Sequence, residues 1–197
     1  MSNSATPGHQ MRLTDRFTQT AVILFGVAMV AFAVIVTIET IGRKFFNISL
    51  QGVDELGGYV LAGTSALAFS LALIERAHIR IDLFHRLLPR PMQRGLDLLS
   101  IVSTALFAIL LAYVGWHTVQ ETVEFRSTAP TPWATPLIWP QSVWLAGLVL
   151  FAAIATLAAA HAAKLAAARR WRDLDRNYGP KGTEEEIREE LADLERR

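Results

Sequence analysis

The five histidines of this 197-residue chain are the residues best suited to bind a haem or a metal ion. A haem held between membrane helices needs two ligands at matching depth, and His117 and His161 both end long apolar runs. These two runs end on opposite sides of the expected membrane, so the two rings cannot face each other across one porphyrin. His78 shares a side with His161 but lies between Arg76 and Arg80. We therefore predict no cofactor, no metal site and no enzymatic activity, with a membrane redox subunit as an alternative.

A carboxylate near the middle of a membrane span would indicate a proton or ion relay. Glu39 is the nearest candidate, but it ends the first apolar run, where its side chain is expected to reach water. The spans therefore offer no central charge. A self-sufficient small four-helix exporter stays open as an alternative function, and it would require Glu39 to be essential.

Three charged residues flank the connection between the first and second apolar runs. Arg43 follows the first run, and Asp54 and Glu55 open the second, where the helix dipole favours negative charge. All three are expected near the same membrane interface, where Arg43 can form an ion pair with one of the two carboxylates. They are candidate contacts for a protein that docks at the outer face, and dipole compensation is the competing structural explanation for the acids.

A second charged group lies between the second and third apolar runs. Its candidate contacts with a large partner subunit or with lipid headgroups are Arg76, His78, Arg80 and Asp82. Apolar residues at helical spacing share the same stretch, namely Ile79, Leu83, Phe84, Leu87 and Leu88. This pattern predicts a short amphipathic helix in the plane of the headgroups, ended by Pro89. A solvated loop is the alternative structure for this stretch. For the arginines, the alternative role is to hold the protein at the cytoplasmic membrane surface, as basic residues near span ends commonly do.

The charged groups described above lie at the ends of long apolar runs, and these runs must position them. Of all residues in the chain, 52% are hydrophobic, and they are clustered in these runs. We predict an all-α integral membrane protein with four transmembrane helices, at about 20–41, 54–74, 94–118 and 142–164. The first run is too long for a secretory signal and ends in charged residues, so we expect it to be retained. Small residues in the second run favour close helix packing. They are Gly57, Gly58, Ala62, Gly63, Ser65, Ala66 and Ala68.

The predicted membrane domain covers residues 15–170. Residues 1–14 form an N-terminal tail, and 171–197 form a C-terminal tail with a short amphipathic helix that begins at a capping box, Thr183 to Glu186. Before the fourth span, prolines and tryptophans alternate, and four prolines in eleven positions are expected to keep the segment from being helical. These prolines are Pro130, Pro132, Pro136 and Pro140.

The distribution of Lys and Arg predicts the orientation in the membrane. Twelve of them flank the spans on the side of the two termini, and three, Arg43, Lys44 and Arg126, flank the spans on the other side. Basic residues accumulate on the cytoplasmic side, so both termini are predicted to be cytoplasmic.

The bulk composition excludes several function classes. Nineteen basic and 18 acidic residues nearly cancel, which argues against a nucleic-acid partner. The chain has no cysteine, which excludes thiol redox chemistry and disulfides. We find no nucleophile elbow, no glycine-rich phosphate loop and no metal-binding histidine spacing.

Taken in order, these residues resemble the small membrane subunit of tripartite ATP-independent periplasmic (TRAP) transporters, the DctQ-type small permease. The resemblance rests on Gly42-Arg43-Lys44-Phe45, on Asp54-Glu55-Leu56, on the stretch from Glu75 to Leu83, and on the Pro- and Trp-rich approach from Thr128 to Gly147. It covers roughly residues 15–170.

This resemblance implies a non-enzymatic partner of a large TRAP permease in the bacterial inner membrane. A periplasmic substrate-binding protein would deliver an organic acid, and a sodium gradient would drive its uptake. The sodium and substrate sites would belong to the large subunit, while this chain contacts that subunit, the binding protein and membrane lipid. The identity of the acid does not follow from these residues.

Overall fold

The computed structural model describes residues 13–49, 51–74 and 88–178. In chain order the helices are α1 (Leu13–Ile41), the π-helical turn η1 (Gly42–Phe46), α2 (Val53–Ile74), α4 (Arg90–Phe125), α5 (Ile138–Ala167) and α6 (Trp171–Tyr178). The prediction of an all-α fold with four transmembrane helices is confirmed, because four helices of the described chain are long and apolar enough to cross a bilayer. The in-plane helix predicted between the second and third spans lies outside the described residues.

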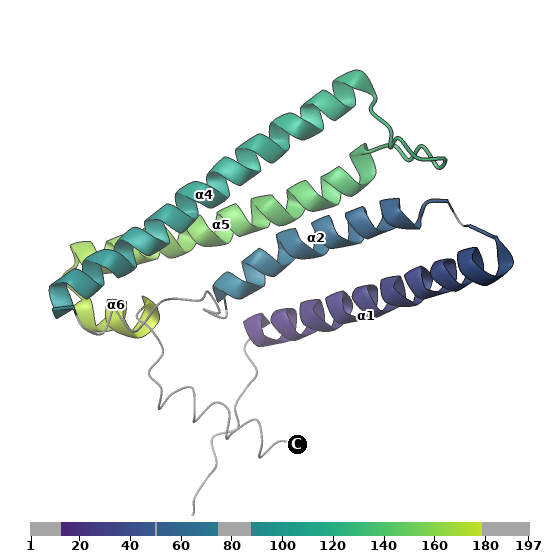
Figure 1. Ribbon diagram of the computed structural model, residues 1–197. Coiled ribbons are helices and arrows are strands. Elements are labelled where there is room, and N and C mark those ends of the chain that lie inside the picture. The colour runs from purple at the N-terminus through teal and green to yellow at the C-terminus, as the bar shows by residue number, and fades with distance from the viewer. Residues whose placement is uncertain (1–12, 50, 75–87, 179–197) are drawn as a thin grey trace, which may run out of the picture.

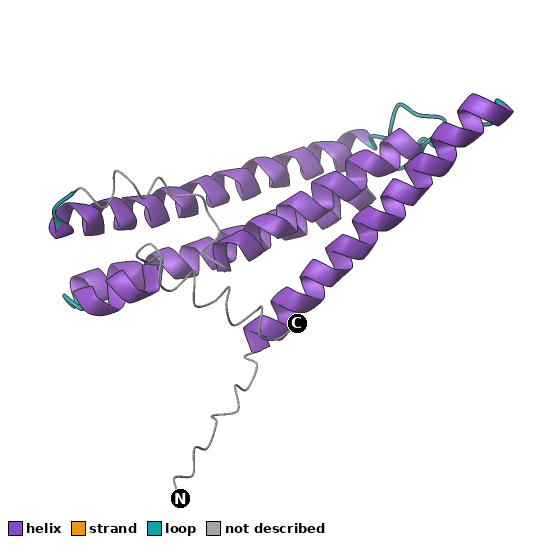
Figure 2. Ribbon diagram, turned by 60° about the horizontal axis from the view of Figure 1, so that its bottom comes forward, coloured by secondary structure: helices purple, strands orange, loops and turns teal. Residues whose placement is uncertain are grey.

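The four long helices lie side by side in a row (Figure 1). In this row α5 packs between α4 and α2, and α1 packs mainly against α2. Figure 2 shows that α1 diverges from the other helices toward its N-terminus. Large apolar side chains of α1 are therefore exposed, among them Val27, Val30 and Val34. In a membrane such a surface faces lipid or another transmembrane protein.

Small residues set the distances between neighbouring helices, as the composition of the second span predicted. A Cβ atom added at Gly147 of α5 would lie 2.8 Å from the Cβ of Ala66 in α2, so the two backbones meet there. Between α4 and α5, the buried core is mostly alanine and consists of Ala105, Ala108, Phe151 and Ala155. Close backbone packing of this kind is the main source of helix association in membranes.

The start of α5 differs from the sequence prediction. The helix begins at Ile138, before the predicted start at 142, so Pro140 lies in its first turn. Proline is tolerated there because the first backbone N–H groups of a helix have no acceptor within the helix. The expectation that all four prolines prevent helix formation is therefore wrong for Pro140.

The short helix α6 turns back over the ends of α4 and α5, a contact that the sequence did not predict. Leu174 is 1% exposed and packs against Ile101, Ala162 and Leu165. Arg94 of α4 forms an ion pair with Asp175 at 2.8 Å between Nη2 and Oδ2. The amphipathic helix predicted from Thr183 onward lies outside the described residues.

Candidate functional site

The connections α1–α2 (residues 42–52) and α4–α5 (residues 126–137) lie at the same end of the row of helices, called here the loop end (Figure 1). The opposite end carries α6. The three residues predicted to contact a docking protein, Arg43, Asp54 and Glu55, all lie at the loop end, as expected from the sequence. Two buried carboxylates organise this end, and each belongs to a different polar cluster.

The first cluster surrounds Glu39, which is 6% exposed at the end of α1. Arg43 Nη2 and Ser49 Oγ both donate hydrogen bonds to Glu39 Oε1, each at 2.7 Å. Ser49 can return to Glu39 because the π-helical turn ends at Phe46 and the next residue, Asn47, adopts a left-handed conformation with φ of 57°. The buried carboxylate is thus paired with a cation and a hydroxyl donor, which offsets the cost of removing it from water.

A cavity of about 280 Å³ opens beside this cluster between α1 and the start of α2. Its charged lining residues are Glu39, Arg43, Lys44 and Asp54. Two cations and two carboxylates line this small space, so their formal charges cancel.

The second cluster joins α2 to the connection between α4 and α5. Glu55 is 8% exposed; Tyr59 Oη donates to its Oε1 at 2.6 Å, and Thr131 Oγ1 donates to its Oε2. Beside this cluster the indole of Trp133 packs directly on Gly52, where any Cβ atom would collide with the ring. The carboxylate of Glu55 therefore fastens the α4–α5 connection to the first turn of α2.

The structure contradicts two details of the sequence prediction. Arg43 pairs with Glu39 and not with Asp54 or Glu55, because residues four apart on a helix are neighbours. The expectation that the Glu39 side chain reaches water is also wrong, since Arg43 and Ser49 cover it. Of the two acids that open α2, Asp54 is exposed and Glu55 is buried.

Comparison with protein families connects this arrangement to a known one. Residues 32–165 match the family described as tripartite ATP-independent periplasmic transporters, DctQ component. The match extends from the middle of α1 to the last turn of α5, so it covers well over half of the chain and includes both polar clusters. The chain belongs to this family. No curated protein and no solved structure matches the chain.

Membership of the DctQ family makes the chain a small permease component of a TRAP transporter, and the family is a transporter component, not an enzyme family. Together with the four apolar helices, it makes the chain a multi-pass membrane protein. Within the described residues, no group of three His, Asp or Glu side chains is placed to hold a metal ion. The polar clusters of this DctQ chain fix the geometry of the connections.

The charged hinge of the DctQ chain stays a prediction, because its four candidate contacts lie outside the described residues. These are Arg76, His78, Arg80 and Asp82. The predicted separation of His117 and His161 is confirmed, since the two residues lie near the C-terminal ends of antiparallel helices α4 and α5. His161 Nδ1 lies 2.9 Å from the hydroxyl of Tyr178, and the ring of His117 packs edge-on against Tyr113.

Sequence reasoning did not identify Ser49, Tyr59 and Thr131 as partners of the two carboxylates of the DctQ chain. Tyr59 follows Glu55 by four positions, so helical spacing could have revealed that pair. Thr131 is separated from Glu55 by 76 positions, and no local pattern connects them. Trp133 lies in the Pro- and Trp-rich approach to the fourth span, and its contact with Gly52 was likewise not predicted.

Proposed function

We propose that this DctQ chain supports the large permease of a TRAP transporter in sodium-driven uptake of an organic acid that a periplasmic binding protein delivers. The family match over residues 32–165 carries this proposal. The chain itself contributes structure, and the ion and substrate sites belong to the large subunit. It has no catalytic activity of its own.

The distribution of charge along the helices supports this division of labour. No Asp, Glu, Lys or Arg occurs between Glu55 and Ile74 in α2, between Asp97 and Glu121 in α4, or before Lys164 in α5. Glu39 lies near the end of α1 and is already paired with Arg43. A sodium ion or an organic acid would therefore find no charged partner along the middle of these helices.

The exposed face of α1 is the surface that we propose for contact with the large permease. α1 is the outermost helix of the row beside α2, and it has the smallest buried share of the four long helices. Because α1 buries little of its surface against its own chain, it is the helix that packing against another subunit would stabilise most.

Two matched substitutions test this contact. Val30 in α1 and Leu106 in α4 are 65% and 64% exposed, respectively, at opposite edges of the row. We expect Val30→Trp to reduce co-purification of the large permease in mild detergent, and Leu106→Trp to leave it unchanged. If only Leu106→Trp disrupts the complex, the contact face is α4. If the wild-type chain alone carries out uptake in proteoliposomes, the supporting role itself is rejected.

The orientation proposed for the chain places it in the bacterial inner membrane with both termini cytoplasmic and the loop end in the periplasm. There, Arg43 and Asp54 would meet the binding protein, and Glu55 would hold the α4–α5 connection in place for that contact. Because the chain has no cysteine, single cysteines report their own exposure. We expect a membrane-impermeant maleimide to label Arg126→Cys, and not Arg169→Cys, in cells with a permeable outer membrane. The reverse pattern would contradict this orientation.

A further inference from the structure

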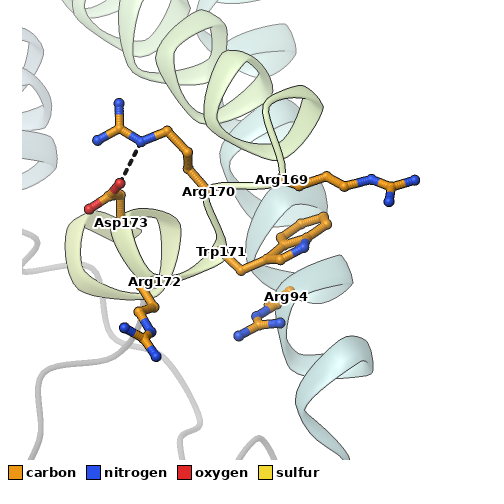
Figure 3. A pocket seen from close by; sticks show the side chains of 6 residues that line it. All are labelled: Arg94, Arg169, Arg170, Trp171, Arg172 and Asp173. Atoms are coloured by element: carbon orange, nitrogen blue, oxygen red, sulfur yellow. Dashed lines mark hydrogen bonds and ion pairs between the residues drawn. The ribbon is translucent and has the colours of Figure 1, made fainter.

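A basic pocket lies at the α6 end, where the chain leaves α5 and turns over α4. Arg169 produces this turn with a left-handed φ of 54°. The pocket has a volume of about 460 Å³ (Figure 3). It is lined by Arg94, Arg169, Arg170, Trp171, Arg172 and Asp173. This volume lies within the range of about 300–1,000 Å³ that is usual for small-molecule sites.

The charges around the pocket do not cancel. Asp175 forms an ion pair with Arg94, and Asp173 forms one with Arg170 at 2.6 Å between Oδ2 and Nε, drawn as a dashed line in Figure 3. Arg169 and Arg172 have no acidic partner within the part of the chain that the structure describes. Among the residues that the structure describes, these two guanidinium groups are therefore uncompensated, and the guanidinium is the group best suited to bind a phosphate through paired hydrogen bonds.

The position of the pocket relative to the membrane indicates what kind of phosphate it meets. α5 is long and apolar enough to cross a bilayer and ends at Ala167, two residues before Arg169, so the pocket is expected on the headgroup side of this span. The indole of Trp171 lies at this level, with the guanidinium carbon of Arg94 5.4 Å from its ring centroid. Tryptophan and arginine at the end of a span mark the headgroup layer.

We propose that this pocket and its rim bind the phosphate headgroups of anionic phospholipids. Arg169 and Arg172 point to opposite sides of Trp171 (Figure 3), so each would donate hydrogen bonds to the phosphate of a separate lipid, and the indole of Trp171 would pack against the glycerol and the first methylene groups. The bound lipids would cover the α5–α6 turn beside α4, and would add to the contacts that already hold α6 in place. A membrane surface that contains anionic lipid attracts basic side chains near the end of a span.

The test compares binding of phosphatidylglycerol and phosphatidylcholine to the full-length chain in neutral detergent, counted by native mass spectrometry. We expect preferential binding of phosphatidylglycerol. The double variant Arg169→Asn/Arg172→Gln should weaken it by roughly tenfold or more, because two charges are lost. Asparagine is chosen at 169 because it accepts the left-handed conformation.

A matched control removes the same charge from the loop end. Arg126→Asn/Lys44→Gln also replaces one arginine in the left-handed conformation, with φ of 49°, and one exposed cation, and it should leave lipid binding unchanged. Arg169→Lys/Arg172→Lys keeps the charge and should retain more binding than the neutral pair, which separates loss of the site from misfolding. Equal binding of the two lipids, an equal loss in both neutral variants, or full displacement of the lipid by millimolar inorganic phosphate would overturn the proposal.

Discussion

Thr131 donates a hydrogen bond to Glu55 across 76 positions of the sequence, and this bond connects the α4–α5 connection to the first turn of α2. The contact of Trp133 with Gly52 lies beside it. The two connections at the loop end are therefore one packed unit. A protein that docks there would meet a preformed surface, which lowers the entropic cost of binding.

Removal of the Thr131 hydroxyl should loosen this unit. Thr131→Val keeps the shape of the side chain but removes one of the hydroxyl donors of the Glu55 carboxylate. We expect the melting temperature in detergent to fall by roughly 2–6 °C. Thr128→Val is the control, since Thr128 is exposed in the same connection. Equal melting temperatures for both variants would show that the hydroxyl of Thr131 contributes nothing to stability.

The pairing of Arg43 with Glu39 gives a second prediction. Arg43→Gln leaves a buried carboxylate with one fewer donor and without its cation, and should lower the free energy of unfolding by about 1–3 kcal/mol. The double variant Glu39→Gln/Arg43→Gln should recover part of this loss, because the uncompensated charge is gone. Lys44→Gln, one residue away and exposed, should have little effect. Additive losses in the double variant would argue against coupling between the two residues.

Substitutions of two helical glycines by alanine should have opposite effects. Gly147→Ala brings a Cβ atom to 3.1 Å from the carbonyl carbon of Ala66, so the α2 and α5 backbones must separate. We expect a loss of about 1–3 kcal/mol of stability. At Gly58 a new Cβ atom meets nothing within 4 Å, and Gly58→Ala should stabilise α2 by up to about 1 kcal/mol. Unfolding in mixed micelles measures both, and a stable Gly147→Ala protein would refute the close approach.

The docking of α6 depends on Leu174. Leu174→Ala removes the side chain that fills the space between Ile101 and Leu165, so α6 should detach from α4 and α5. Hydrogen–deuterium exchange of the backbone over Trp171–Tyr178 should then accelerate markedly. The same substitution at Leu157, which is 71% exposed on α5, serves as the control and should leave this segment protected. Unchanged exchange in Leu174→Ala would mean that the remaining contacts of α6, Arg94 with Asp175 and His161 with Tyr178, hold the helix without this side chain.

Most of the architecture could be predicted from the sequence, because a bilayer imposes simple requirements on length and composition. In a bilayer, the backbone N–H and C=O groups of an uncharged stretch such as Leu56–Ile74 must bond to each other, and a spanning helix allows this. The observed α2 contains the whole stretch. Helix ends were harder to predict. Proline usually ends a helix, yet Pro140 lies inside α5. In the first turn a backbone N–H has no acceptor within the helix, so the N–H that proline lacks is not needed there.

The sequence by itself determined that this is a four-helix membrane protein of the DctQ type, with its charges near the helix ends. Arg43 pairs with Glu39, four positions earlier on the same helical segment, and this pair follows from local spacing. Only the tertiary structure decided that Glu55 accepts a hydrogen bond from Thr131 in a distant connection. The order of the helices and the docking of α6 were decided in the same way. Hydrophobicity acts on each segment separately and can be read locally, whereas hydrogen bonds and close packing depend on which segments become neighbours.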